Sequence, residues 1–340
     1  HRLLEVEWGD GERPVFRRDL QNPIDADALI IDELSMIDTV LFANLLEAVP
    51  FGCRLILVGD SDQLPPVGAG NVLHDLIDSG LIPVIRLNQV FRQAEQSRIV
   101  TNAHRIIRGE MPEIKNDGDF FFLERKNAVF AARTVTELCT TRLPEAYGIS
   151  PIDDLQVLCP SRNGLCGTEN LNKSLQEQLN PADDKKKEIK AAGFIFREGD
   201  KVMQTKNNYD LEWTNGFGKG MGVFNGDLGV IKKIRPLEGI LEINFDGKEV
   251  LYPAEKLGEL ELAYAITVHK SQGSEYDTVV LPIIDAASKL LYRNLLYTAV
   301  TRAKRLIVIV GLQSRLNDMV NNDRQNKRYS ALRAFLESAI

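Results

Sequence analysis

The sequence predicts an α/β protein made of two parallel-sheet domains, with a small β-barrel inserted in the second. Short apolar strands that end in polar loops recur along the chain, and helical patterns separate them, as in parallel sheets covered by helices. A first set comprises 27–33, 54–60 and 82–87, and a second set comprises 120–124, 155–159, 278–284 and 305–310. Residues 196–257 instead alternate apolar and polar side chains, which is typical of antiparallel strands.

The composition is that of a globular protein with more than one core. A chain of 340 residues is long for a single core, and its 44% hydrophobic and 26% charged residues are ordinary values.

No apolar run approaches the ~18 residues of a membrane helix, so we expect no membrane partner and a cytoplasmic location. The four cysteines form no C-x-x-C pair, which favours reduced thiols. A net charge of −7 argues against non-specific coating of nucleic acid but allows a local basic channel.

The first domain is expected to begin with a hairpin and to continue as strand, helix, strand. The hairpin turns at Gly9–Gly11, within an insertion that covers about 5–24. After the strand at 27–33, Asp38 is a suitable N-cap residue for a helix. The apolar residues at helical spacing that follow it are Leu41, Leu45, Leu46 and Val49.

Polar side chains follow two neighbouring strands of this domain. Asp32 and Glu33 end the apolar run in "LIIDELSM", and Asp60, Asp62 and Gln63 follow the run in "RLILVGDSDQL". The carboxyl ends of parallel strands meet at one edge of a sheet, where ligands bind. A solvated strand end is the ordinary explanation for one Asp-Glu pair. Phosphoryl transfer instead needs an acid for Mg²⁺, a group that orients water and a polar sensor of the γ-phosphate, and this set could supply all three.

Two arginines are candidates for stabilising the negative charge that develops on the phosphoryl oxygens during transfer. They are Arg92 in "LNQVFRQ" and Arg302 in "YTAVTRAK". A lone arginine is usually a surface residue, but each of these follows an apolar segment suited to a domain interface. In the β-rich region, Asn225–Gly226 and Asp246–Gly247 predict hairpin turns.

The motifs in their order resemble those of superfamily 1 DNA helicases, and most closely the RecD family. This is the 5′-to-3′ group related to the exodeoxyribonuclease V alpha subunit. The resemblance runs from His1 to about residue 312 and rests on the following segments. They are "LIIDELSM" (Walker B), "LILVGDSDQLPPVGAG", "LNQVFRQ", "GDKVMQTKNNYD" with "FNGDLGVI", "AYAITVHKSQGSEYDTVVLP" and "LLYTAVTRAKRLIVIVG".

The resemblance implies a role for each residue that matches a catalytic motif. Asp32 would hold Mg²⁺ through water, and Glu33 would polarise the attacking water. Gln63 would sense the γ-phosphate of ATP. Arg92 and Arg302 would be arginine fingers that stabilise the transition state.

Other residues would contact the nucleotide base and ribose. Phe91 stands where many relatives have tyrosine, so it would keep stacking on adenine but would lose a hydroxyl contact. Glu275 in "QGSEYD" is similar to the family's ribose-contacting glutamate, and Gly273 of the same segment is assigned to the nucleotide site with it.

The resemblance also implies partners. Thr267 and His269 match a motif that touches single-stranded DNA, and His1 begins "HRLLE", which resembles another DNA-contacting segment. The expected partners are single-stranded DNA and single-strand/duplex junctions, and other recombination subunits remain open as further partners. ATP and Mg²⁺ are the implied cofactors.

The implied domains are RecA-like. An incomplete first domain covers 1–92, and the second covers 93–195 and 258–340. The insert at 196–257 would be an SH3-like β-barrel.

The sequence departs from the family pattern in one respect. It contains no G-x-x-x-x-G-K-[ST] loop, and "GFGKGMG" at 216–222 has no Ser or Thr after its lysine. We therefore expect a C-terminal fragment of a longer ATP-dependent helicase, which binds ATP poorly and hydrolyses none by itself. The alternatives are a DNA-binding scaffold with a dead ATP site and a phosphohydrolase unrelated to DNA.

Overall fold

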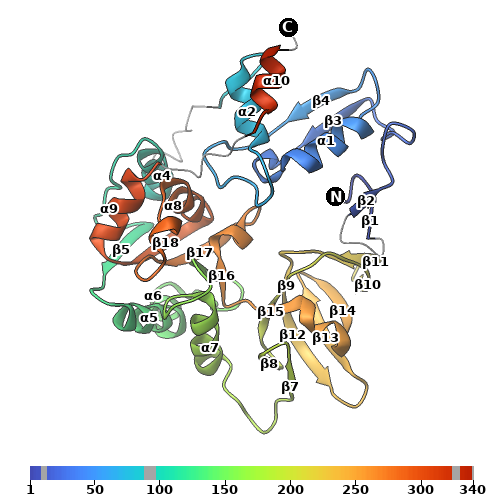
Figure 1. Ribbon diagram of the computed structural model, residues 1–340. Helices are drawn as coiled ribbons and strands as arrows, with labels where there is room; N and C mark the ends of the chain where they lie inside the picture. Colours follow the sequence, from blue (N-terminus) through green and yellow to red (C-terminus); the bar gives the residue numbers. More distant parts are fainter. Residues whose placement is uncertain (9–13, 88–96, 324–329, 339–340) are drawn as a thin grey trace. The chain divides into compact units, whose positions relative to one another are not determined.

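The computed structural model describes residues 1–8, 14–87, 97–323 and 330–338 (Figure 1). The chain divides into two compact units, which are His1–Phe91 with Arg324–Ile340, and Arg92–Asp323. Among the described residues, none of the helices has the length and apolar character that crossing a membrane requires.

The first unit contains a two-stranded parallel sheet with helices. Strand β3 (Ala28–Ile31) pairs in parallel with β4 (Arg54–Leu57). Helix α1 (Thr39–Ala48) begins as predicted, because the Asp38 side chain accepts a hydrogen bond from the Leu41 backbone N–H at 2.8 Å. The other elements are the hairpin strands β1 (Val6–Trp8) and β2 (Pro14–Phe16), the turn η1 (Leu34–Met36), and the helices α2 (Val72–Ser79) and α10 (Leu332–Ser338).

Two expectations for this unit differ from the structure. The predicted strand at 82–87 is wrong, because these residues form no strand and Ile85 and Leu87 are exposed. Apolar residues form a strand only where a neighbouring strand accepts and donates their backbone hydrogen bonds. The second difference concerns residues expected at the end of the second domain, since Arg324–Ile340 belong to the first unit. There α10 packs against α2.

The second unit is built on a five-stranded parallel sheet in the order β16-β6-β17-β18-β5. Its strands are β5 (Phe120–Glu124), β6 (Leu155–Cys159), β16 (Ala265–Thr267), β17 (Tyr276–Pro282) and β18 (Ala303–Gly311). Its helices are α4 (Arg98–Ile107), α5 (Ala128–Glu137), α6 (Leu143–Tyr147), α7 (Thr168–Leu179), α8 (Arg293–Thr301) and α9 (Gln313–Asn321). The short turns are η2 (Leu138–Arg142), η3 (Ala254–Glu259), η4 (Val268–Ser271) and η5 (Ser288–Leu290). The expected second parallel sheet is therefore confirmed.

A seven-stranded antiparallel sheet lies in the sequence between β6 and β16, as expected for an insert. Its order is β11-β10-β14-β13-β12-β9-β15. The strands are β9 (Lys201–Gln204), β10 (Asn208–Asn215), β11 (Gly218–Val223), β12 (Leu228–Arg235), β13 (Ile240–Phe245), β14 (Lys248–Pro253) and β15 (Leu260–Leu262). A separate hairpin, β7 (Glu188–Ala191) and β8 (Phe194–Arg197), precedes them.

The two hairpin turns predicted in this insert had different outcomes. Asp246–Gly247 joins the paired strands β13 and β14, and both residues have positive φ angles of 47° and 82°. Asn225–Gly226 connects β11 to β12, which are not neighbours in the sheet, so the prediction of a hairpin there is wrong. Strand β12 pairs with β9 and β13 instead, and local turn residues do not encode that choice of neighbour.

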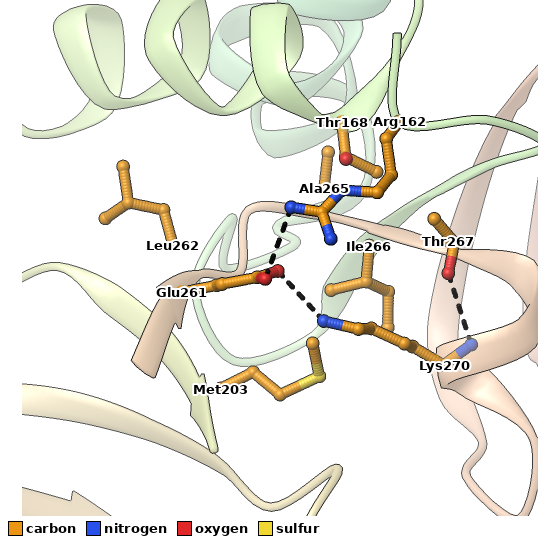
Figure 2. Close-up of a pocket in the computed structure, with 9 residues that line it drawn as sticks. All are labelled: Arg162, Thr168, Met203, Glu261, Leu262, Ala265, Ile266, Thr267 and Lys270. Carbon is orange, nitrogen blue, oxygen red and sulfur yellow. Dashed lines mark hydrogen bonds and ion pairs between the residues drawn. The ribbon is translucent and has the colours of Figure 1, made fainter. Parts of the chain in front are cut away.

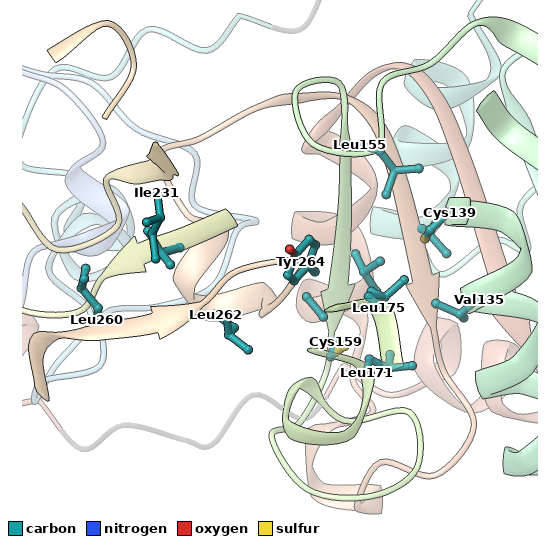
Figure 3. Packing of buried hydrophobic residues seen from close by; sticks show 14 of the residues in the cluster. Val135, Cys139, Leu155, Cys159, Leu171, Leu175, Ile231, Leu260, Leu262 and Tyr264 are labelled. Atoms are coloured by element: carbon teal, nitrogen blue, oxygen red, sulfur yellow. The ribbon is translucent and has the colours of Figure 1, made fainter. Parts of the chain in front are cut away.

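The insert and the parallel sheet share one hydrophobic core. Figure 3 shows Tyr264 between Ile231 and Leu260 of the insert and Leu155 and Cys139 of the parallel-sheet domain. Because the same buried cluster contains residues of both parts, the insert is joined to this domain by packing as well as by its two chain connections.

Buried polar groups join the same two parts. Asp200, at the start of the insert, accepts hydrogen bonds from Asn180 Nδ2 at 2.7 Å, Gln176 Nε2 at 2.6 Å and the Tyr264 hydroxyl at 2.9 Å. Burial raises the pKa of the Asp200 carboxyl, and these donors lower it only in part.

Candidate nucleotide and nucleic-acid site

Within the first unit, candidate site residues lie where β3 and β4 end. The two strands are parallel neighbours, paired from Ala28 with Arg54 to Ile31 with Leu57. The backbone N–H of Leu34, after β3, donates to the Val58 carbonyl, after β4, at 2.9 Å. The loops that carry Asp32–Glu33 and Asp60–Gln63 therefore meet at one edge of the sheet, as expected.

A glycine permits this close approach of the two loops. A Cβ atom added at Gly59 would lie 3.1 Å from the Leu34 nitrogen and 3.2 Å from the Ser35 nitrogen. It would also lie 2.9 Å from Leu73 Cδ2. A side chain at position 59 would therefore press the strand-end loops apart.

Glu33 adopts an unusual backbone conformation. Its φ and ψ angles are 53° and 41°, in the left-handed region that non-glycine residues rarely occupy. The Asp32 Oδ1 atom accepts a hydrogen bond from the Glu33 N–H at 2.8 Å, which supports this turn. Strained conformations of this kind cluster at functional sites, where they aim side chains.

The Gln63 side chain is buried, and its two amide atoms differ in their hydrogen bonding. It is 9% exposed, and its Nε2 atom donates to Asp60 Oδ2 at 3.4 Å. Its Oε1 atom is buried and has no hydrogen-bond partner among the residues that the structure describes. An orphaned buried acceptor is unfavourable in a folded protein, so its presence at this position indicates a group held ready for a ligand.

The residues at this edge fit a magnesium ion that is held mainly by water and phosphate. Among the described residues, no three His, Cys, Asp or Glu side chains gather as in an all-protein metal cage. Mg²⁺ in nucleotide sites keeps several waters and uses one or two carboxylates beside the phosphates. Asp32 would hold the ion, which would neutralise charge on the phosphates.

Within the second unit, a separate set of candidate residues surrounds Arg302, at the end of α8. Its side chain is 5% exposed, and Nη1 donates to the Ser274 carbonyl oxygen at 3.0 Å. The Arg302 Nε atom is buried, and none of the described residues forms a hydrogen bond with it. Gly273 and Glu275 flank Ser274, so the structure brings these three predicted nucleotide-site residues together within the second unit.

Glu275 and Gly273 differ from Arg302 in their surroundings. Glu275 is exposed, and its Oε2 atom lies 3.4 Å from Lys304 Nζ. Gly273 has a φ angle of 75°, which favours glycine in the turn before β17. This arrangement leaves the Glu275 carboxylate at the surface, where a sugar hydroxyl could reach it.

The predicted DNA-contacting residues of the second unit lie at the end of β16. The Thr267 side chain accepts a hydrogen bond from the Lys270 N–H at 3.3 Å and so caps η4. Burial lowers the pKa of His269, so its ring is neutral at neutral pH and can accept as well as donate a hydrogen bond.

A small cavity beside Thr267 is lined by charged residues that were not predicted as site residues (Figure 2). Its volume is about 50 Å³. Glu261 accepts from Lys270 Nζ at 2.9 Å and from Arg162 Nη2 at 3.4 Å. Lys270 follows His269 directly, which is the one sequence signal that could have identified it. Arg162 is 99 residues away from Glu261 in the sequence, so only the fold reveals the pair.

Three predicted residues are not placed in a site by the structure. Phe91 and Arg92 lie outside the described residues. His1 is exposed, and its ring centroid lies 6.1 Å from that of Phe16 in the first unit.

Three protein families match successive parts of the chain. Residues 6–122 match an AAA domain, 171–245 match the "ATP-dependent RecD-like DNA helicase SH3 domain", and 262–310 match the "UvrD-like helicase C-terminal domain". The second match begins within α7 and ends with β13, so it overlaps most of the antiparallel insert and confirms the expected SH3-like part.

Curated relatives match nearly the whole chain. The ATP-dependent RecD2 DNA helicase of Deinococcus radiodurans is 38% identical over 324 residues, which are 92% of this chain and 40% of that protein. The RecBCD enzyme subunit RecD of Mycobacterium tuberculosis is 32% identical over 357 residues, which are 99% of this chain and 57% of that protein. The chain thus spans about half the length of these relatives.

Solved structures agree with this fold and with the three family matches. The Pif1 helicase of Candida albicans matches with a TM-score of 0.50 and 19% identity over 92% of this chain and 76% of that chain. A Pif1 helicase from a study of forked duplex DNA matches with a TM-score of 0.50 and 17% identity over 91% of this chain and 76% of that chain. Family matches, relatives and fold agree, and they show that the chain resembles the RecD-like superfamily 1 DNA helicases.

Proposed function

We propose that the chain carries most of the motor of an ATP-dependent DNA helicase. The motor moves along single-stranded DNA in the 5′-to-3′ direction, and it acts in the cytoplasm in recombination or repair. Single-strand/duplex junctions are its substrate, and ATP with Mg²⁺ drives it. The ATP-dependent RecD2 DNA helicase among the relatives supports the helicase activity, and the family resemblance supports the direction of movement.

One observation supports the nucleotide chemistry more than any other. Within the described part of the chain, Gln63 Oε1 and Arg302 Nε are both buried without a hydrogen-bond partner, and both residues match phosphate-contacting positions of the family. One is an acceptor in the first unit and the other is a donor in the second unit. The proposal assigns each a bond to the nucleotide or to its water, which would satisfy an otherwise unfavourable buried group.

The roles of the site residues follow from their chemistry. Asp32 would hold Mg²⁺, and Glu33 would accept a proton from the attacking water. Arg302 would stabilise the charge on the phosphoryl oxygens, together with Arg92.

Other assignments complete the proposed nucleotide and DNA contacts. Phe91 would stack on adenine, and Glu275 with Gly273 would contact the ribose. Thr267 and His269 would contact the backbone of single-stranded DNA. His1 would add a DNA contact from the first unit.

The first test is ATP hydrolysis by this chain with and without single-stranded DNA. The 340 residues contain no G-x-x-x-x-G-K-[ST] loop, so we expect no turnover in either condition. DNA-stimulated turnover by the chain alone would contradict the proposed inactivity. The natural protein that contains this chain is then assayed in the same way. Single-stranded DNA binding without turnover in that protein would favour a scaffold with a dead ATP site.

The role of Glu33 is tested by Glu33→Gln in that natural protein. The variant keeps the shape and hydrogen bonding of the side chain but cannot accept a proton, so we expect ATP binding without hydrolysis. Glu47→Gln, on the exposed face of α1, is the matched control. Near-normal turnover by Glu33→Gln would remove Glu33 from the role of base.

The role of Arg302 is tested against a neighbouring arginine. Arg302→Ala should lower kcat by about 1,000-fold or more, as loss of an arginine finger does. Arg305→Ala removes an exposed guanidinium from strand β18, which follows Arg302, and should leave kcat within a few-fold of the parent value. Equal losses in both variants would show that Arg302 acts through general charge or folding.

A further inference from the structure

The segment "GFGKGMG", which is no phosphate loop, forms the end of a hairpin in the insert. Strands β10 and β11 pair in register from Glu212 with Met221 to Asn215 with Gly218. The Asn215 Oδ1 atom accepts hydrogen bonds from the Phe217 and Gly218 backbone nitrogens, both at 2.9 Å. The tip is therefore a structured turn that presents one aromatic side chain.

Packing of an aromatic ring along the stem supports this tip. The Trp213 ring lies against the Gly220 backbone, since a Cβ atom added there would be 2.2 Å from Trp213 Cζ2. Lys248 Nζ, on β14, lies 5.6 Å from the centroid of the same ring. The glycine is required for this packing, and the packing holds the hairpin in one shape.

Phe217 stands at the tip without contact from the rest of the described chain. Its exposed fraction is 102%, and Cβ atoms added at Gly216 and Gly218 would meet nothing within 4 Å. Both faces of the phenyl ring are thus open. Lys219, next to this turn, is also exposed.

The exposed Phe217 ring and the nearby Lys219 ammonium group are suited to binding single-stranded nucleic acid. Single-stranded nucleic acid offers unpaired bases that stack on aromatic rings, and each base is joined to a phosphate that a lysine can neutralise. Leu237, at another tip of the same insert, is equally exposed at 104% but has no π-face and is followed by Glu238.

We propose that the β10–β11 hairpin is a nucleobase-stacking contact for single-stranded DNA. Phe217 stacks on one base, and Lys219 neutralises a flanking phosphate. The inference rests on the proposed function, because it assumes that single-stranded DNA passes this insert. It assigns a DNA-binding role to a segment outside the helicase motifs.

The experiment is a fluorescence anisotropy titration of a labelled oligothymidine strand with this chain and its variants, repeated at several salt concentrations. Phe217→Ala should weaken binding roughly 5- to 150-fold, which is the range measured for stacking on one base. Phe217→Trp should bind at least as well as the parent. Lys219→Ala should lower the slope of log K against log salt by about 0.7, as loss of one phosphate contact does on single strands.

Leu237→Ala provides the matched control, since it removes an equally exposed apolar side chain and should leave the affinity unchanged. Unchanged affinity in Phe217→Ala, with the parent binding DNA, would overturn this inference and leave the proposed function standing. Equal losses in Phe217→Ala and Leu237→Ala would also overturn it, because no stacking would be involved. If the parent chain itself bound no single-stranded DNA, both the inference and the proposed DNA contacts would fall.

Discussion

Replacing Lys201 by methionine tests how the insert is joined to the parallel-sheet domain. Lys201 is 5% exposed on β9, and its Nζ atom donates to the Leu155 carbonyl oxygen of β6 at 3.0 Å. Burial lowers the pKa of Lys201 from 10.5 to about 8, and nearby Asp153 and Asp154 oppose this only in part. Burying the protonated Lys201 side chain should therefore lower the free energy of unfolding. Methionine has a similar length but no charge, so it should not carry this penalty.

The magnitude follows from the link between proton binding and folding. Between a pH of about 8 and 10.5, the unfolded chain holds a proton on Lys201 that the folded chain has lost. Unfolding then takes up a proton, so the free energy of unfolding rises with pH in this window. At about 1.4 kcal/mol for each pH unit, the lowering from 10.5 to about 8 corresponds to about 3 kcal/mol. The parent should gain this amount relative to Lys201→Met as the pH rises through the window.

The assay is urea unfolding followed by circular dichroism, for parent and variant, at several pH values from about 7 to about 10.5. Effects of other groups cancel in the difference between the two proteins. Lys233→Met, on the exposed side of β12, controls for the removal of a lysine charge. A difference that stays constant within about 1 kcal/mol would refute the reasoning, because it would show that the Lys201 ammonium is solvated in the folded chain.

Three further variants test local features of the structure. Tyr264→Phe removes the hydroxyl that donates to Asp200 and should lower the free energy of unfolding by about 1.5–3 kcal/mol in urea titrations; no loss would mean that water replaces the bond. Gly220→Ala should displace the Trp213 ring and shift its fluorescence emission, with a loss of about 1–3 kcal/mol, and an unchanged spectrum would contradict the packing described. Asp38→Ala removes an N-cap and should lower the free energy of unfolding by about 1 kcal/mol, whereas Asp38→Asn should restore most of it.

Local patterns were sufficient for much of the second unit. The strands predicted at 120–124 and 155–159 have the same limits as β5 and β6. A strand in a covered parallel sheet is apolar on both faces, so its limits are visible in the sequence as a short continuous run. The turn at Asp246–Gly247 was also predictable, because two residues with positive φ favour Asp-Gly there.

Predictions failed where the outcome depends on a distant partner. The apolar run at 82–87 resembles a strand, but it has no ladder to join among the described residues. The helix α10 was expected with the second domain, yet Leu332 and Leu336 pack against the core of the first unit. Amphipathic character predicts that a helix is covered, but it does not identify what covers it.

Some features of the candidate site were likewise predictable from the sequence, and others were not. The sequence by itself determined which residue types stand at the ends of the strands, and hence that Asp32, Glu33 and Gln63 would share one edge of a parallel sheet. Only the tertiary structure decided that Gln63 and Arg302 each have a buried side-chain atom without a hydrogen-bond partner among the described residues. It also decided that Arg162 and Lys270 both donate hydrogen bonds to Glu261. Strand ends follow from local periodicity, whereas burial and ion pairing depend on segments that meet only after the chain has folded.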